Sequence, residues 1–180
     1  MKDECKILDV GCGRRKRNGA IGIDVNPRSD ADVIHDLNLC PYPFPENHFD
    51  EIIADNVLEH LDEVLKVMEE LHRIAKPSAH ITIIVPFYPH RQANTDPTHK
   101  HFFGVRSFDY LFSDNSYADF QYSSAHFALN SVEYEKGLTQ AHWFDTMIVA
   151  FANKRKDFYE NRLANIFPVR NITFELVVKK

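Results

Sequence analysis

The sequence predicts an α/β fold built on a mostly parallel, twisted sheet. Five short apolar runs occupy positions 6–10, 20–25, 31–35, 50–54 and 80–85. Several are continuous rather than alternating, which is typical of parallel strands buried on both faces. After the fourth run, apolar side chains recur at three- or four-residue steps as far as Ile74, which indicates an amphipathic helix of about five turns.

The sequence also predicts where this helix begins and ends. Asn56, followed three residues later by Glu59, matches a capping box. Lys76-Pro77 supplies the stop, because the residue before a proline disfavours helical backbone. We therefore expect one uninterrupted helix that starts at Asn56.

Composition indicates one domain spanning 1–180. A chain of 180 residues with 44% hydrophobic content can bury one substantial core. The three cysteines form no C-x-x-C pair, which argues against a disulfide framework or a cysteine zinc site. No run of eighteen apolar residues and no signal peptide is present, so we expect a cytoplasmic protein without a membrane partner. The net charge of -5 disfavours nucleic acid as a partner.

The first strand runs into a Gly-x-Gly turn at Gly11 and Gly13, and the next apolar run ends on Asp24. Glycines allow a sharp turn and a close approach to a ligand, and an acid at this place can accept hydrogen bonds from a ribose. Lys16 stands where a dinucleotide fingerprint has its third glycine, and Asp24 follows too soon. The pattern therefore favours a nucleotide-like ligand other than a nicotinamide dinucleotide.

Five sequence blocks, in family order, resemble class I S-adenosylmethionine-dependent methyltransferases. They are L-D-V-G-C-G at 8–13, G-I-D-V-N-P at 22–27, V-I-H-D-L at 33–37, F-D-E-I-I-A-D-N-V-L-E-H-L at 49–61 and L-H-R-I-A-K-P at 71–77. The resemblance implies a Rossmann-like fold with an antiparallel C-terminal edge strand, and S-adenosylmethionine as cofactor. A D-P-T-H segment at 96–99 is similar to one in a small type of this family with a shortened first loop.

The resemblance also implies a cofactor site. Asp9 would fix the loop and approach the methionine amino group, Asp24 would bind the ribose, and Asp36 with Leu37 would contact adenine. Asp55 and Asn56 would line the methionine moiety. The complete set is Asp9, Gly11, Cys12, Gly13, Asp24, Val25, Asp36, Leu37, Asp55 and Asn56. Asp36 and Leu37 also fit an ordinary turn, and Asn56 also fits a helix cap.

The connection between Gly13 and Ala20 is too short for the helix that normally joins neighbouring parallel strands. We therefore expect the first helix to be shortened or missing. In the last third, alternating positions predict strands at 125–134 and 172–178, which the resemblance implies are an antiparallel pair at the sheet edge. Helical spacing at 143–151 and a polar stretch at 154–166 predict two helices.

A long segment at about 87–122 is expected to be a lid or a substrate-binding insertion, because loops of this length in compact domains tend to be functional. It carries His90, Asp96, His99 and His101. A histidine beside an acid can take a proton from a methyl acceptor, or two histidines and a carboxylate can bind a metal. The third interpretation is a rigid turn at 96–99 whose side chains bond their own backbone.

We predict His99, Asp96 and His60 as catalytic residues, with no metal; for His60, packing against the sheet is the alternative. Arg14, Arg15, Lys16 and Arg17 form either a solvated loop or a contact for an anionic substrate.

The predicted function is methyl transfer to an oxygen or nitrogen of a small molecule such as a sugar, a metabolite or a cofactor precursor. A non-catalytic S-adenosylmethionine-binding or partner-binding protein is the alternative, and a metal-dependent enzyme is a third hypothesis. A homodimer is an open possibility, since the aromatic-rich stretch at 102–127 can bury itself in a second subunit.

Overall fold

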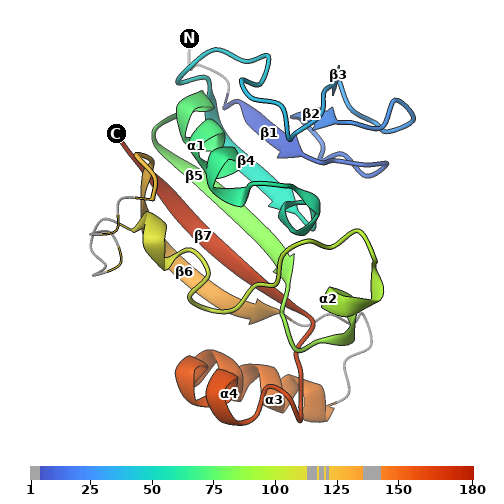
Figure 1. Cartoon of the computed structure of the whole chain (residues 1–180), viewed down its shortest axis with the longest axis vertical. Helices are drawn as coiled ribbons and strands as arrows, with labels where there is room; N and C mark the ends of the chain where they lie inside the picture. Colours follow the sequence, from blue (N-terminus) through green and yellow to red (C-terminus); the bar gives the residue numbers. More distant parts are fainter. Residues whose placement is uncertain (1–4, 113–116, 118–119, 121, 136–142) are drawn as a thin grey trace.

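The computed structural model describes residues 5–112, 117, 120, 122–135 and 143–180. These residues form a seven-stranded sheet in the order β3-β2-β1-β4-β5-β7-β6 (Figure 1). Strands β1 to β5 are parallel, and β7 is antiparallel to both β5 and β6. The predicted α/β class and the antiparallel C-terminal pair are confirmed, with β6 as the outermost strand. The strands are β1 Ile7–Val10, β2 Ala20–Asp24, β3 Val33–Ile34, β4 Phe49–Asp55, β5 Ala75–Pro86, β6 His126–Glu135 and β7 Asn171–Lys179.

The helices of the described residues are few and short. One helix of three turns lies in front of β4 and β5, and two helices lie beyond the ends of β6 and β7 (Figure 1). They are α1 Val64–Ile74, α2 Arg91–Thr95, α3 Trp143–Lys154 and α4 Lys156–Arg162, with 3-10 turns η1 Leu58–His60 and η2 Asp109–Leu111. None is long and apolar enough to cross a membrane within the part of the chain that the structure describes.

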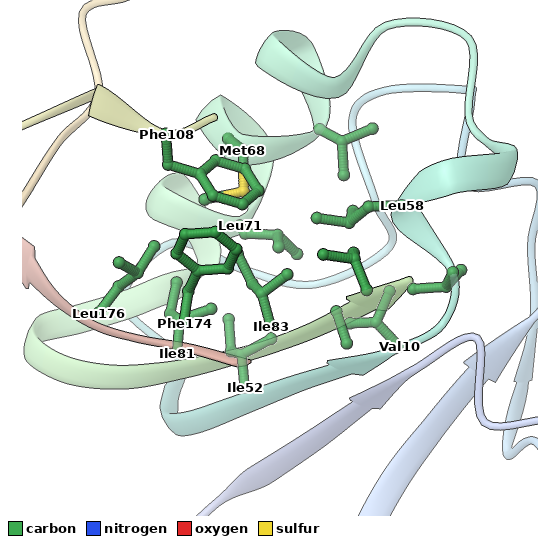
Figure 2. Packing of buried hydrophobic residues seen from close by; sticks show 14 of the residues in the cluster. Val10, Ile52, Leu58, Met68, Leu71, Ile81, Ile83, Phe108, Phe174 and Leu176 are labelled. Carbon is green, nitrogen blue, oxygen red and sulfur yellow. The ribbon is translucent and has the colours of Figure 1, made fainter. Parts of the chain in front are cut away.

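The core lies between α1 and one face of the sheet. Met68 and Leu71 on α1 are fully buried and face Ile52, Ile83 and their neighbours on the central strands (Figure 2). Phe108, from the long segment after β5, packs edge-on against Phe174 in β7. Burial of this kind stabilises a fold by roughly 25 cal/mol for each Å² of apolar surface removed from water. One continuous apolar layer therefore joins β1 to β6.

The other face of the sheet is not fully covered, so the expectation of burial on both faces is wrong for part of β5. On β5, His80 is exposed and Thr82 and Ile84 are half-buried, while Ile81 and Ile83 between them are buried. A groove of about 790 Å³ runs over this face. The reason is that residues 11–19 and 25–32, which join β1 to β2 and β2 to β3, form turns in place of helices.

The predicted helix from Asn56 is interrupted. The backbone forms η1, leaves the helical path at Leu61 (φ -80°, ψ 156°), and resumes as α1. The amides of Lys100 and His101 donate to the Glu59 carbonyl, and His101 Nε2 contacts the Leu61 carbonyl at 2.9 Å. These carbonyls would bond to the next turn in a continuous helix. Contacts with Lys100 and His101 thus replace the hydrogen bonds that a continuous helix would make here.

The segment at 87–122 divides into two parts. Residues near α2 line a pocket, whereas Phe103, Phe108, Leu111 and Phe112 are buried in the core cluster. The second part therefore contributes to the core. A lid role for the first part stays a prediction.

The C-terminal helices cover the end of the sheet. The side-chain amide of Asn153 in α3 makes two hydrogen bonds to the backbone of Tyr134. Its Oδ1 accepts from the Tyr134 amide at 2.8 Å, and its Nδ2 donates to the Tyr134 carbonyl at 2.9 Å. The helix expected at 154–166 is shorter than predicted, since α4 ends at Arg162 and its Tyr159 hydroxyl is committed to the Phe167 carbonyl at 2.6 Å.

Candidate functional site

The Gly-x-Gly turn after β1 has backbone that favours glycine at both positions. Gly11 and Gly13 have φ of 65° and 54°, a left-handed conformation that other L-residues adopt at a cost. A Cβ on Gly11 would meet Val57 at 2.5 Å, whereas a Cβ on Gly13 would meet nothing within 4 Å. Open space beside Gly13 is what a ligand at this turn requires.

Asp24, at the end of β2, is held in a fixed orientation. Its Oδ2 accepts from the Gly13 amide at 2.9 Å and its Oδ1 accepts from the Asn26 amide at 2.7 Å. A carboxylate oxygen can accept two hydrogen bonds, so each oxygen keeps one position for a ligand. Two such positions, side by side, fit the vicinal hydroxyls of a ribose, and the residues present therefore fit the adenosyl part of S-adenosylmethionine.

A short loop at 14–19 joins β1 to β2 without a helix, as the sequence predicts, and it is anchored at two points. The Arg17 amide donates to Asp9 Oδ2 at 2.8 Å, and Lys16 pairs with Asp32, whose carboxylate also accepts from the Gly22 amide. Asp9 is buried, and burial raises its pKa. Fixing of the loop by Asp9 therefore agrees with the geometry, while its contact to a methionine amino group stays a prediction.

Cys12, Leu37 and Val25 differ in what they can offer a ligand. Burial raises the pKa of the Cys12 thiol to about 11, so it stays protonated, and its sulfur lies against Gly22. Leu37 is buried, with its carbonyl accepting from the Tyr42 hydroxyl at 2.9 Å, whereas Val25 is 61% exposed. Asp36 Oδ1 accepts from the Asn38 amide at 2.9 Å, as in the turn interpretation. Their cofactor contacts stay predictions.

Asn56 is not a helix cap. Its φ is 53°, its side chain donates to Asp55 Oδ1 at 2.6 Å, and the residue before η1 is Val57, which makes no side-chain capping bond. Both Asp55 and Asn56 are exposed at the end of β4. They therefore remain available to a ligand at the carboxyl ends of the strands, where parallel sheets bind ligands.

A pocket of about 780 Å³ lies next to this edge of the sheet. Asn56 belongs to its lining, which links it to the predicted cofactor side. The pocket is lined by Arg15, Asn56, Glu59, His60, Pro86, Arg91, Gln92, Thr95, Asp96, Pro97, His99 and Arg170. All three predicted catalytic residues, His60, Asp96 and His99, line it.

His60 and Asp96 are joined through Thr98. The Thr98 hydroxyl donates to Asp96 Oδ1 at 2.7 Å and therefore accepts from His60 Nδ1, which lies 2.8 Å away. These Thr98 hydrogen bonds hold the pKa of Asp96 below its usual value. Burial is the main cause that lowers the pKa of His60. His60 thus makes a polar contact with Thr98, while its catalytic role stays a prediction.

His99 meets His60 edge to face, with ring centres 4.7 Å apart. Its Nδ1 lies 3.0 Å from the Ala93 carbonyl, which can only accept, so the proton is on Nδ1 and Nε2 is free. That Nε2 lies 3.9 Å from Glu59 Oε1. We call Glu59, His60 and His99 the Glu59 cluster.

Glu59 was missed as a site residue because its spacing also fits a capping box. Its side chain is 1% exposed, and neither carboxylate oxygen has a hydrogen-bond partner. Burial raises its pKa to about 7. The signal in the sequence was the pair Glu59-His60 directly after a strand end, where one residue is acidic and the next titrates near neutrality.

The four groups named from the 87–122 segment do not form one cluster. His90 accepts from the Gln92 amide at the start of α2, and His101 contacts the Leu61 and Asp62 carbonyls. Only Asp96 and His99 reach the pocket. The two histidines and one carboxylate that the metal alternative requires are therefore not brought together from these four residues, because His90 and His101 contact backbone groups.

Positive charge at the pocket comes from three separate parts of the chain. Arg15 from the 14–19 loop lines it, as the anionic-substrate hypothesis requires, whereas Arg17 lines the groove on the other face. Arg91 of α2 and Arg170 before β7 complete the set and were not singled out from the sequence. They are far apart along the chain, so only the fold brings them together.

Comparisons with known proteins agree with the fold. Residues 8–83 match the sequence profile of the methyltransferase domain family. Among solved structures, a methyltransferase from Archaeoglobus fulgidus, described as S-adenosylmethionine-dependent, is 18% identical with a TM-score of 0.58, over 96% of this chain and 86% of its own. One from Mesorhizobium loti is 13% identical with a TM-score of 0.57, over 96% and 90%. No curated protein matches the chain significantly in sequence.

A further neighbour is the Haemonchus contortus phosphoethanolamine N-methyltransferase 2, solved with phosphomonomethylethanolamine and S-adenosylhomocysteine. It is 15% identical with a TM-score of 0.55, over 99% of this chain and 49% of its own. At identities this low, the structural likeness establishes the fold alone. The family match and these neighbours support the predictions of a methyltransferase and of S-adenosylmethionine as its cofactor. Residues 8–83 thus match the methyltransferase domain family, and the chain has the fold of the class I S-adenosylmethionine-dependent methyltransferases.

Proposed function

We propose that the protein transfers a methyl group from S-adenosylmethionine to an oxygen or nitrogen of a small anionic molecule. The observation that carries the proposal is the adjacency of two sites. The carboxyl ends of β1, β2 and β4 fit the cofactor, and the pocket beside Asn56 holds both titratable groups and arginines. Arginine binds phosphate or carboxylate through paired hydrogen bonds, which favours an anionic acceptor.

The methyl group of S-adenosylmethionine is already activated, since it is carried on a sulfonium. The protein's contribution is to hold donor and acceptor in line and to exclude water. Asp24 and the Gly11–Gly13 turn would hold the adenosyl part. Arg91 and Arg170 would orient the acceptor's anionic group. The proton that the acceptor loses would leave to solvent through the pocket that the Glu59 cluster lines.

The cofactor half of the proposal is tested by calorimetry. S-adenosylmethionine and S-adenosylhomocysteine should both bind the purified protein, and NAD should not. Asp24→Ala should abolish this binding, because it removes both positions for the ribose. Asp30→Ala is the matched control, since Asp30 is an exposed acid in the next turn. Equal binding by the two variants would contradict the proposed role of Asp24.

The acceptor half is tested with labelled methyl donor and fractions of a cell extract, separated by charge. Label should pass to a small anionic compound. With that compound identified, Arg91→Gln should raise its KM more than it lowers kcat, because the arginine binds the acceptor in the ground state and the transition state alike. Arg28→Gln is an exposed control outside the pocket. Label in neutral compounds alone would contradict the anionic class.

The short loop at 14–19 favours a second candidate, a non-catalytic S-adenosylmethionine-binding protein. In this fold a helix normally follows the glycine turn and directs its N-terminal dipole at the ligand, and here turns stand in its place. Cofactor binding without methyl transfer to any extract fraction would favour this candidate. Loss of turnover in His99→Gln with cofactor binding intact would favour the enzyme.

A further inference from the structure

We infer that the Glu59 cluster is a binding site for a divalent first-row transition-metal ion, held by Glu59, His60 and His99. One ligand atom from each of the three side chains lies within 4.8 Å of the other two. Two histidines and one carboxylate, with remaining positions open, form a donor set that suits zinc, manganese, iron or cobalt. The inference does not require a methyl donor and can be tested without one.

The buried carboxylate is the first argument. Glu59 is 1% exposed, and both its oxygens are without hydrogen-bond partners. A buried acid in this state costs several kcal/mol unless a cation or a donor compensates it, on the order of magnitude known for buried polar and charged groups. Its Oε1 faces His99 Nε2 at 3.9 Å, too far for a hydrogen bond between them. A cation between the two atoms satisfies both.

The orientation of the imidazoles is the second argument. Metal-binding histidines usually donate their other ring N–H to an oxygen, which fixes the tautomer. His99 Nδ1–H donates to the Ala93 carbonyl, and His60 Nδ1–H donates to Thr98, whose own hydroxyl donates to Asp96. Both Nε2 atoms are thereby left as lone-pair donors. Thr98 and Asp96 act as positioning residues for His60.

The spacing is close to that of a bound site. Ligands on a tetrahedral ion with bonds of about 2.1 Å lie roughly 3.4 Å apart. The Nε2 to Oε1 distance of 3.9 Å exceeds this by less than the reach of a small side-chain rotation. The cluster also lines the pocket, so an ion there keeps open positions toward the acceptor. It would bind the acceptor's hydroxyl or phosphate oxygen and lower the pKa of a bound hydroxyl, whose proton then leaves to solvent.

The test is a titration of tag-free, chelator-treated protein with Zn²⁺ by calorimetry and with Co²⁺ by visible absorption. We expect one Zn²⁺ per chain, Co²⁺ bands of a low-coordinate nitrogen–oxygen site, and much weaker binding of Mg²⁺, which prefers oxygen ligands. Glu59→Gln and His99→Gln should each lower the affinity for Zn²⁺ at least tenfold. Thr98→Val should lower this affinity by about 10–100-fold, the range for groups that orient metal ligands.

His80→Gln is the matched control, since it removes an exposed histidine on the other face of the sheet. Its Zn²⁺ affinity should equal that of the unaltered chain. Unchanged Zn²⁺ affinity in Glu59→Gln, or equal losses in His80→Gln and His99→Gln, would overturn the inference and indicate surface histidines as the binding groups.

A second measurement covers variants that fail to fold. Nitrogen NMR of the histidine rings in the unaltered chain should show Zn²⁺ shifting Nε2 of His60 and His99 while Nδ1 stays protonated. Shifts confined to other histidines would overturn the inference. Calorimetry with S-adenosylmethionine on metal-free protein separates this result from the proposed function, because cofactor binding does not depend on the ion.

Discussion

Gly11 and Gly13 share a backbone conformation but differ in their surroundings. Both have positive φ, yet a Cβ on Gly11 would meet Val57 at 2.5 Å and one on Gly13 would meet nothing within 4 Å. Because Val57 belongs to the core cluster, it cannot move away freely. The first glycine is therefore required by packing, whereas the second leaves the open space that the proposed ligand needs.

We predict that Gly11→Ala lowers the free energy of unfolding by about 2–4 kcal/mol, from the left-handed backbone and the overpacked side chain together. Gly13→Ala should cost only about 1 kcal/mol of stability. Gly13→Ala should nevertheless weaken the binding of S-adenosylmethionine. Urea unfolding and calorimetry measure the two effects. Equal losses of stability would show that Val57 yields to the new methyl group.

His72 gives the fold a dependence on pH. Its Nε2 donates to the Lys179 carbonyl at 2.8 Å, its ring packs on Phe127, and burial lowers its pKa. The unfolded chain therefore binds a proton more readily than the folded one. Stability from this residue is fully present above about pH 6.5 and is lost as the pH falls through the folded-state pKa.

His72→Gln should keep the bond to the Lys179 carbonyl and reduce the loss of stability below about pH 6.5. Thermal unfolding at a series of pH values measures this. The exposed His80→Gln should reproduce the unaltered profile. An acid profile that is identical in His72→Gln would assign the pH dependence to other groups.

At the scale of elements, α1 contacts the loop between β3 and β4 as well as the sheet. Glu70 is buried and accepts from the Tyr42 amide at 2.6 Å, while Arg73 pairs with Glu70 and donates to the Tyr42 and Phe44 carbonyls. This network fixes the loop between β3 and β4, which carries Asp36 and Leu37. The predicted adenine contacts therefore depend on a helix that lies outside the site.

We predict that Arg73→Met lowers the free energy of unfolding by about 3–5 kcal/mol, because it leaves the Glu70 carboxylate buried without its partner. Lys66→Met is the control: its pair with Glu63 is exposed to solvent, and such pairs contribute little to stability. Urea denaturation measures both. A loss in Arg73→Met no larger than in the control would mean that water reaches Glu70.

Some of the helices and strands could be predicted from the sequence and others could not. Continuous apolar runs gave the parallel strands, and the gap between Gly13 and Ala20 correctly predicted the missing helix, because both depend on local chain geometry. The break at Leu61 could not be predicted, since it depends on His101 reaching the Leu61 carbonyl from a distant segment. Arg170 could not be predicted for the same reason, since its neighbours in the pocket come from remote parts of the chain.

At the scale of the whole molecule, the cofactor site and the C-terminal pair share one core. The apolar cluster includes Leu8 of β1 and Val178 of β7 and is continuous through the central strands. Helix α1 covers one face of β4 and β5, and β5 is partly open on the other face. With one shared core, binding at the β1–β2 end should stabilise every strand of the sheet.

We predict that S-adenosylmethionine at a hundred times its Kd raises the free energy of unfolding by about 2.7 kcal/mol. For a chain of this length the Tm should rise by about 2–4 °C for each kcal/mol. Calorimetry should show a single transition, and hydrogen exchange should slow in β6 and β7 as well as in β1 and β2. Protection confined to β1–β3, or two transitions, would show that the ends of the sheet unfold separately. The same titration in Asp24→Ala should leave both the Tm and the exchange rates unchanged, which ties the stabilisation to the ribose contact at the end of β2.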